Sequence, residues 1–242
     1  MTDGIELAVS TVIFAIRPDD DAESGVLSIP LVRRTRDPFA GRWSLPGGVA
    51  HADEGLSDTA RRTLIDTTGV RPAYLEQLYA FGGRDRSWSG RVVSVVYWAL
   101  VRRELADQAH EGDNVRWFPA DELPELAFDH NRIVEYALWR LRNKLEYSRI
   151  AHAFLGETFT LTQLRHVHEI VRQVSLDPAN FRRQMESSPA LIDTGEVLAG
   201  GRHRPPRLYR YDASVVLADN GPLDPPPLDP PLLDPPPTDG DR

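Results

Sequence analysis

The first segment of this 242-residue chain with the residue types of a ligand site is a glycine loop that leads into a helix. Residues 39–48 read FAGRWSLPGG, and glycine lets a main chain take unusual angles and approach a ligand closely. We expect the helix over residues 56–68, with Ser57 as N-cap and Gly69 as the residue that ends it. The apolar positions that predict its buried face are Leu56, Ala60 and Leu64. By itself this pattern fits either a phosphate-binding loop or an ordinary loop entering a helix.

A second group of candidate ligand residues lies in residues 81–90, which read FGGRDRSWSG. Arg84 and Arg86 flank an aspartate in this stretch, and Phe81 and Trp88 bracket them. Guanidinium groups suit bidentate contact with phosphate, and aromatic rings can stack on a base. The stretch is therefore either a nucleotide contact or a solvated charged turn.

The third group of candidate residues lies on two helices separated by a short break. Thr160, with a glutamine three residues later, predicts a capped helix through about residue 174, after a first helix opening over residues 147–155. Asp177 is expected to cap a second helix, with proline at its first position. The exposed polar residues expected near the start of that helix are Asn180, Arg182 and Arg183. In helix-turn-helix proteins this part of the second helix meets base edges and phosphates, and asparagine suits adenine as arginine suits guanine.

Two strand-like runs follow, over residues 190–198 and 207–211, and they predict a hairpin. Its tip carries Arg202, His203 and Arg204, which suits a wing that contacts the minor groove or the DNA backbone. The alternative is a small helical accessory domain with a solvated basic loop. His166 and His168 do not share a helix face, so we expect surface or packing roles and no metal site.

The elements that would position these residues are short strands mixed with two helices in the front half of the chain, which predicts an α+β fold. The helices are expected over 56–68 and 131–146. The strands are expected over 7–16, 26–32, 91–101 and 115–119, the first two being antiparallel partners.

Composition divides the chain into residues 1–147, 148–212 and 213–242. The middle region has 9 Lys and Arg against 7 Asp and Glu, although the whole chain has a net charge of −8. A small basic module can bind phosphate locally even when its neighbours are acidic. The last region repeats proline and aspartate and is expected to be a disordered tail.

The bulk composition also excludes several classes of protein. There are no cysteines, which excludes disulfides and thiolate chemistry. Neither a signal peptide nor a run of roughly 20 apolar residues is present, so we expect a cytoplasmic protein without a membrane contact.

The glycine loop and its helix resemble the signature motif of the Nudix family, which is Gly, five residues, Glu, seven residues, Arg-Glu, an aliphatic, any residue, Glu-Glu, any residue, Gly and an aliphatic. The residues that match by type and spacing are Gly48, Glu54, Arg62, Leu64, Gly69 and Val70, preceded by Trp43, Leu45, Pro46 and Gly47. The resemblance implies an α/β/α sandwich in which Glu54 and Arg62 hold the loop to the helix as an ion pair, with Gly69 as a third structural residue of the motif.

The chain departs from that family at the three metal-binding glutamates, whose positions hold Thr63, Asp66 and Thr67. Magnesium requires several anionic oxygens in near-octahedral geometry, and one aspartate with two hydroxyls does not supply them. Without the metal, neither water activation nor pyrophosphate neutralisation is available. We therefore predict a site that binds without turnover, with no catalytic residue, no metal and no cofactor.

The order of the two modules resembles the Nudix-related transcriptional regulators, the NrtR family. The carrying segments are residues 126–130 (LAFDH), 159–164 (FTLTQL), 180–183 (NFRR) and 208–211 (LYRY). The resemblance implies a homodimeric repressor of NAD biosynthesis or salvage genes, with a double-stranded DNA operator and with ADP-ribose or a related NAD metabolite as effector. The expected DNA contacts are Thr160, Asn180, Arg182, Arg183, Arg202, His203 and Arg204. The expected effector contacts are Phe39, Trp43, Pro46, Gly47, Gly48, Arg84 and Arg86.

Two other functions stay open on the sequence. One is an active ADP-ribose pyrophosphatase with an accessory C-terminal domain, which would release AMP in the presence of magnesium. The other is a protein-interaction adaptor, whose affinity for DNA would not depend on Arg182 or Arg202.

Overall fold

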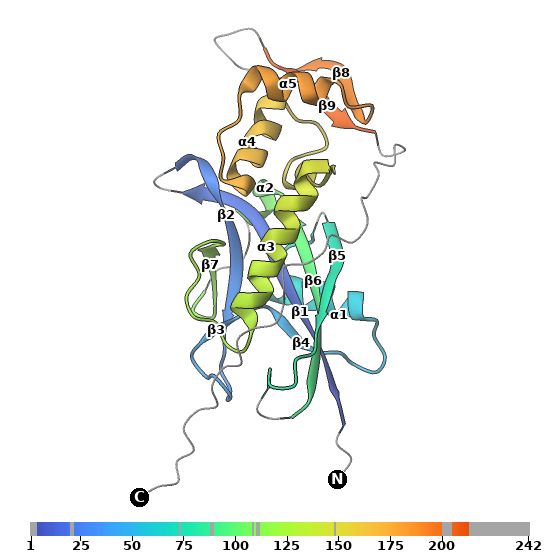
Figure 1. Ribbon diagram of the computed structural model, residues 1–242. Coiled ribbons are helices and arrows are strands. Elements are labelled where there is room, and N and C mark those ends of the chain that lie inside the picture. The colour runs from blue at the N-terminus through green and yellow to red at the C-terminus, as the bar shows by residue number, and fades with distance from the viewer. Residues whose placement is uncertain are drawn as a thin grey trace, which may run out of the picture.

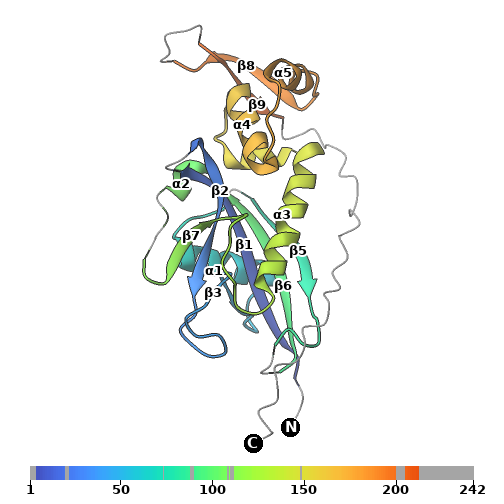
Figure 2. The same cartoon turned by 60° about the vertical axis from the view of Figure 1, so that its left-hand side comes forward.

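The computed structural model describes residues 4–19, 22–72, 74–87, 90–107, 109, 112–147, 149–199 and 205–212. Figures 1 and 2 show a three-layered domain below and a smaller module above it. Helix α3 (His130–Tyr147) lies over the sheet of the lower domain, and its C-terminal end reaches the upper module. The expected α+β class is confirmed. The expected proline-rich tail lies outside the described residues.

The centre of the lower domain is one mixed sheet with the path β3-β2-β1-β6-β5, with β4 added beside β1 and β7 beside β2. Its strands are β1 (Glu6–Asp19), β2 (Ala22–Arg33), β3 (Trp43–Ser44), β4 (Gly47–Val49), β5 (Tyr74–Phe81), β6 (Val92–Val101) and β7 (Val115–Pro119). Strands β1 and β6 are parallel over ten residue pairs, from Glu6–Val92 to Ala15–Val101. The expected antiparallel pairing of β1 with β2 is also present.

Strand β1 has two different neighbours along one of its edges, and the sheet divides between them. The gap leaves room for a ligand. Near its C-terminal end β1 pairs with β2, whereas Ala8 to Ser10 pair instead with β4. The later residues of β2 pair with β7 and β3. The space between the first half of β1 and the end of β2 is thus bordered by the short strands β3 and β4.

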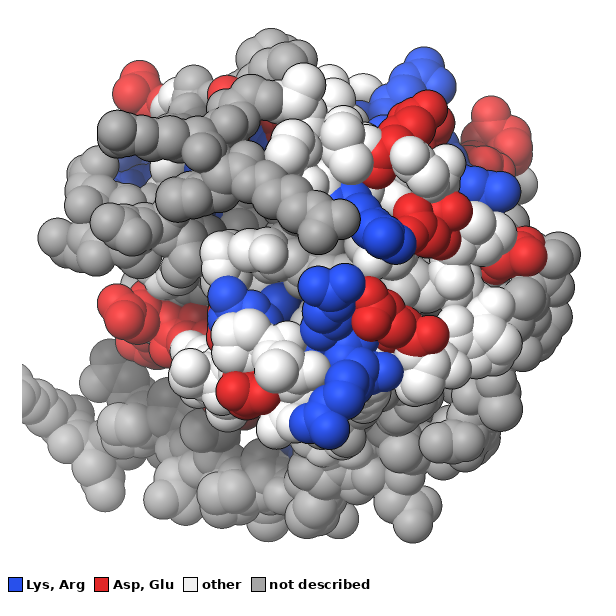
Figure 3. Space-filling view, turned by 90° about the horizontal axis from the view of Figure 1, so that it is seen from above, with Lys and Arg blue, Asp and Glu red and all other residues white. Residues whose placement is uncertain are grey.

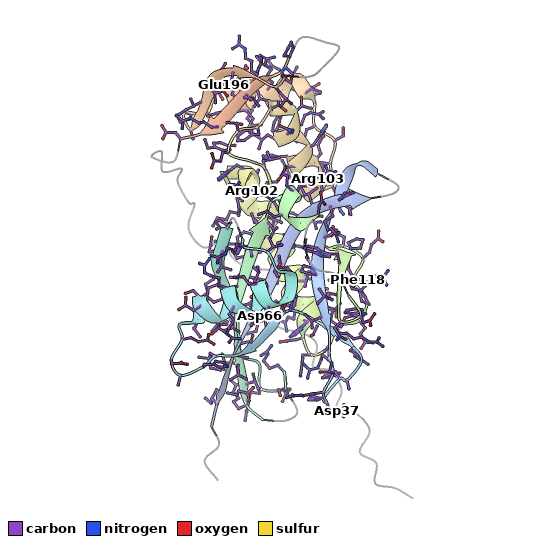
Figure 4. All side chains as sticks on the ribbon, turned by 180° about the vertical axis from the view of Figure 1, so that it is seen from behind. Asp37, Asp66, Arg102, Arg103, Phe118 and Glu196 are labelled. Carbon is purple, nitrogen blue, oxygen red and sulfur yellow. The ribbon has the colours of Figure 1, made fainter. Side chains whose placement is uncertain are left out.

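Alternation along β1 sends successive side chains to opposite faces of the sheet. Val9 and Ile13 pack with helix α1 (Leu56–Thr68), whereas Val12 and Phe14 pack on the side of α3. Helices α1 and α3 therefore cover opposite faces, as Figures 1 and 4 show. A further short helix, α2 (Arg103–Ala106), follows β6.

The upper module begins with the 3₁₀ helix η1 (Arg149–Phe154) and continues with α4 (Leu161–Arg172) and α5 (Pro178–Glu186). A hairpin of β8 (Leu191–Val197) and β9 (Arg207–Tyr211) completes it. The expected first helix over 147–155 is thus a short 3₁₀ helix. Phe154, Phe159 and Val171 belong to the same buried cluster as Phe14 and Trp98 of the sheet, so the two modules share one core.

Two differences from the sequence-based expectations concern the lower domain. The N-cap of α1 is Gly55 and not Ser57, because the carboxylate of Asp58 accepts from the main-chain N–H of Gly55. Strand β5 was not expected and occupies the sheet edge.

In the described ranges no helix is long and apolar enough to cross a membrane.

Candidate functional site

A cavity of ≈ 480 Å³, here called the sheet-end cavity, opens where the sheet divides. Strands β1, β4 and β6, the end of β2 and the start of α3 border it. The residues that give it chemical character are Arg33, Arg34, Arg36, Arg86, Glu6, Ser10, Ser94, Phe128 and His130. Four arginines against one glutamate favour an anionic ligand, and the hydroxyls offer further hydrogen bonds.

Arg86 enters this cavity from the loop after β5 and is held by Asp129 at the start of α3. Its Nη2 and Nε donate to the two carboxylate oxygens of Asp129 at 2.8 and 3.1 Å. The Arg86 side chain is 8% exposed, so this pair is largely removed from water. A ligand phosphate would offer Arg86 a second bidentate partner in competition with Asp129.

His130 is a buried, titratable side chain of the cavity wall. Its Nδ1 accepts a hydrogen bond from the main-chain N–H of Leu45 at 3.0 Å. Burial lowers the pKa of His130 to about 4, so the ring is neutral at pH 7. Because Nδ1 accepts, the proton lies on Nε2, and the histidine carries an N–H donor on the opposite edge of its ring.

Arg34 and Phe128 form a stacked pair at the same wall. The guanidinium carbon lies 4.7 Å from the centroid of the Phe128 ring, and Nε donates to the carbonyl of Pro38 at 2.8 Å. Burial lowers the pKa of Arg34, while Asp37 opposes that shift. Phe39 packs edge-on against Phe128 at 5.0 Å and so stands behind this wall without lining the cavity.

The predicted effector residues separate into two groups. Gly47, Gly48 and Arg86 line the cavity, whereas Phe39, Trp43, Pro46 and Arg84 do not. Trp43 packs edge-on against Phe118 at 5.2 Å and joins the core. Gly47 is required for packing, since an added Cβ would lie 2.4 Å from the carbonyl oxygen of Val9.

Arg33, Arg34, Arg36, Phe128 and His130 line the cavity but were not predicted as effector contacts from the sequence. The signal for the arginines was three of them within four residues directly after a strand. No local signal joins residue 34 to residue 130, since only the fold brings them together.

The structural part of the Nudix motif has the expected ion pair. Arg62 donates to both oxygens of Glu54, at 2.6 Å from Nη2 and 3.1 Å from Nε. These hydrogen bonds lower the pKa of Glu54 to about 2. Gly69 ends α1 in the left-handed region with φ 70°.

The positions of the missing glutamates do not fit a magnesium ion. The hydroxyl of Thr63 donates to the carbonyl of Ala60, and that of Thr67 donates to the carbonyl of Thr63. Asp66 is exposed on α1, on the face of the sheet opposite α3 (Figure 4). In the part of the chain that the structure describes, no three acidic or histidine side chains gather as metal ligands.

The second candidate surface is the outer side of the upper module. Helix α4 has the expected capping box, in which Thr160 and Gln163 exchange hydrogen bonds of 2.8 and 3.1 Å. The carboxylate of Asp177 accepts from the main-chain N–H of Asn180 at 2.8 Å and caps α5. Thr160 is only 4% exposed and serves as this cap, and its DNA contact stays a prediction.

Helix α5 presents the remaining predicted contacts to solvent. Asn180, Arg182 and Arg183 are exposed, whereas Phe181 between them is buried against His168. Arg182 pairs with Glu186 at 2.9 Å, and Arg183 contacts Asn180. Figure 3 shows basic and acidic side chains interspersed on this face.

Beside α5, a groove of ≈ 390 Å³ extends from Arg165 of α4 and Arg182 of α5 to Arg207, at the end of β9 that adjoins the hairpin tip. The predicted wing tip residues Arg202, His203 and Arg204 lie outside the described residues. The strands that carry the tip are present and antiparallel, with Val197 opposite Arg207.

Comparison with known families assigns both modules. Residues 7–137 match the model of the NUDIX domain, and residues 151–211 match that of the NrtR DNA-binding winged helix domain. The chain is 31% identical over 210 residues to the "ADPR responsive transcriptional repressor NtrR" of Acinetobacter baylyi, a match covering 85% of this chain and 81% of the relative. It is also 30% identical over 116 residues to the "ADP-ribose pyrophosphatase" of Methanocaldococcus jannaschii, covering 46% of this chain and 67% of the relative.

The solved structures agree with this assignment. The crystal structure of Shewanella oneidensis NrtR complexed with a 27mer DNA has a TM-score of 0.71 and 36% identity, covering 85% of this chain and 93% of that chain. The match spans both modules and so extends beyond the Nudix sandwich alone. This chain therefore belongs to the NrtR family of transcriptional regulators, in which a Nudix domain is followed by a winged helix DNA-binding domain.

Proposed function

We propose that this protein is a DNA-binding transcriptional repressor that ADP-ribose releases from its operator, and that it acts as a homodimer on genes of NAD biosynthesis or salvage. The observation that carries the sensing role is the sheet-end cavity with four arginines and no fitting metal site beside it. The relatives that match over most of the chain are a repressor described as ADPR responsive and a regulator crystallised with DNA.

The ligand chemistry of the cavity agrees with a nucleoside diphosphate sugar. Arg86 and Arg34 suit the diphosphate, and the ring of Phe128, which also lines the cavity, offers apolar contact. The neutral His130 and the hydroxyl pair of Ser10 and Ser94, 3.0 Å apart, suit ribose oxygens.

Hydrolysis is the second candidate, because a curated relative of the Nudix part is an ADP-ribose pyrophosphatase. Two of the three glutamate positions hold the neutral hydroxyls of Thr63 and Thr67, and this loss of negative charge opposes a metal-dependent reaction here. We expect no AMP release from ADP-ribose with Mg²⁺. The triple variant Thr63→Glu, Asp66→Glu, Thr67→Glu tests whether restored carboxylates confer it. Robust turnover by the unaltered protein would establish the hydrolase instead.

The test of the repressor is selection of genomic DNA fragments by the purified full-length protein, followed by binding to a selected fragment with and without ADP-ribose. We expect fragments that lie upstream of NAD biosynthesis or salvage genes, and weaker binding when ADP-ribose is present. If the protein selects no DNA sequence, the repressor function is contradicted. If NAD metabolites leave DNA binding unchanged, the sensor role is contradicted.

A matched pair of variants separates DNA recognition from a protein-adaptor role. Arg182→Ala should weaken binding to the selected fragment by about 1–3 kcal/mol if Arg182 contacts a base. Arg61, exposed on α1 in the lower domain, provides the control Arg61→Ala with the same charge change. Equal affinity for both variants would favour the adaptor.

A further inference from the structure

The two modules meet at a polar bridge that is separate from the cavity and from the exposed face of α5. Arg142, near the end of α3, donates through Nη2 to both oxygens of Asp121 at 2.7 and 2.8 Å. Its Nε donates to the carbonyl of Val171 in α4 at 2.9 Å. Gln173, the C-cap of α4, donates from Nε2 to Asp121 at 2.7 Å. The lower domain thus holds the end of α4 at two points, the carbonyl of Val171 and the side chain of Gln173.

The same structural unit reaches the sheet-end cavity at its other end. Helix α3 begins at His130, beside the Arg86–Asp129 ion pair, and twelve residues of helix separate His130 from Arg142, or about 18 Å. The loop that precedes α3 also joins the bridge to the cavity. It runs from Asp121, in the bridge, to Asp129, which holds Arg86 at the cavity. Helix α3 thus links the cavity to Arg142, and the loop links it to Asp121, which accepts a hydrogen bond from Gln173 of the winged module.

Helix α3 is suited to move as a rigid element. Its Ile133, Ala137 and Leu141 are fully buried in the core that the two modules share. Packed interfaces of this kind shift between discrete arrangements more readily than they deform. A ligand that draws Arg86 away from Asp129 removes one anchor of the first turn of α3, and the displacement reaches Arg142.

We infer that Asp121, Arg142 and Gln173 are positioning residues that hold the winged module in its DNA-binding orientation and couple it to the occupancy of the sheet-end cavity. This inference rests on the proposed function. The bridge makes no contact with the ligand or with DNA, and it acts through α3 and α4. The bridge therefore determines the coupling factor, that is, the ratio of the DNA dissociation constants with and without saturating ADP-ribose.

Two substitutions that conserve charge test the bridge without altering the electrostatic attraction of DNA. Gln173→Gly removes the amide, and glycine is favoured at this position because Gln173 has φ 54° in the left-handed region. Arg142→Lys keeps the charge but cannot span Asp121 and Val171 with a planar fork. Arg140→Lys, two residues earlier on the same helix, is the matched control.

The readouts are DNA affinity by fluorescence anisotropy with and without ADP-ribose, ADP-ribose affinity by calorimetry without DNA, and the melting temperature. We expect a coupling factor of about 5–150 for the unaltered protein and for Arg140→Lys. For Gln173→Gly and Arg142→Lys we expect a factor close to 1, with ADP-ribose affinity unchanged. Variants that retain the full factor overturn the inference even if their melting temperature falls. An unaltered protein with no ADP-ribose effect would instead refute the sensor function itself.

Discussion

His130 lies in the cavity wall as a neutral acceptor for the N–H of Leu45, and this state makes folding sensitive to acid. Its pKa is about 4 in the folded protein and near 6.5 in the unfolded chain, so the unfolded chain binds more protons between these values. The stabilisation is present above pH 6.5 and is lost as the pH falls toward 4. We expect this residue to remove about 2 kcal/mol of unfolding free energy between pH 7 and pH 5.

Urea denaturation at pH 7 and pH 5 measures this loss, and His130→Asn is the comparison. Asparagine keeps an acceptor oxygen for the Leu45 N–H but does not titrate. The variant should therefore lose less stability on acidification. His168, whose pKa burial also lowers to about 4, continues to contribute in both proteins. Equal losses for the two proteins would contradict the assignment of His130 as a buried neutral base.

For single residues, the sequence predicted the members of short motifs better than the residues that line the cavity. The Glu54–Arg62 pair and both helix caps at Thr160 and Asp177 follow from short spacings, and each is present. Trp43 and Arg84 were assigned to the ligand from their neighbours in the sequence, yet neither lines the cavity. Arg34 and His130 escaped notice because tertiary packing, and not local pattern, places them together.

Among the elements, α5 depends on a cap that is itself negatively charged. The carboxylate of Asp177 satisfies the main-chain N–H of Asn180, so Asp177→Ala should lower the unfolding free energy by about 1 kcal/mol. Asp177→Asn keeps a capping oxygen and should leave stability nearly unchanged. Because it removes a negative charge next to Arg182 and Arg183, it should also tighten DNA binding at low salt.

Thermal denaturation and anisotropy titrations of these two variants check this expectation. Weaker DNA binding by Asp177→Asn, with stability retained, would show that the carboxylate itself contributes to recognition. If Asp177→Ala weakens DNA binding while the protein keeps its stability, loss of the helix cap does not explain the weaker binding.

Two elements of the lower domain were predicted with their full bounds. Residues 56–68 and 115–119 were predicted with the bounds that α1 and β7 have. Strand β5 was missed because it lies at an edge, where its side chains alternate irregularly between half-buried and exposed. The first helix of the upper module was predicted as regular, but Arg149–Phe154 forms a 3₁₀ helix whose buried residues pack into the shared core.

For the whole molecule, the shared core predicts that the two modules unfold together. Phe154 is 1% exposed and lies among residues of both modules. Phe154→Ala should lower the unfolding free energy by about 3–5 kcal/mol, and the loss should affect both modules in one transition. Calorimetry together with circular dichroism tests this, and two separate transitions in the unaltered protein would contradict it.

The acidic C-terminal region predicts an electrostatic effect on DNA binding. Residues 213–242 contain six aspartates and one arginine. Removing them should raise DNA affinity several-fold at low salt, and the difference should vanish toward 1 M salt, where the Debye length is about 3 Å. Replacing the six aspartates by asparagine in the full chain is the matched control. If truncation raises DNA affinity but the six Asp→Asn substitutions do not, the negative charge of this region is not the cause.

The parallel pairing of β1 with β6 has a consequence for biosynthesis. Glu6 and Val92 lie side by side although 86 residues separate them, so the middle of the sheet cannot close until β6 has been synthesised. Contacts between distant chain segments slow folding because loop-closure entropy must be overcome first. The winged module is translated later still and needs that sheet as a packing surface. We therefore expect a nascent chain to acquire affinity for DNA only in the final stage of its synthesis.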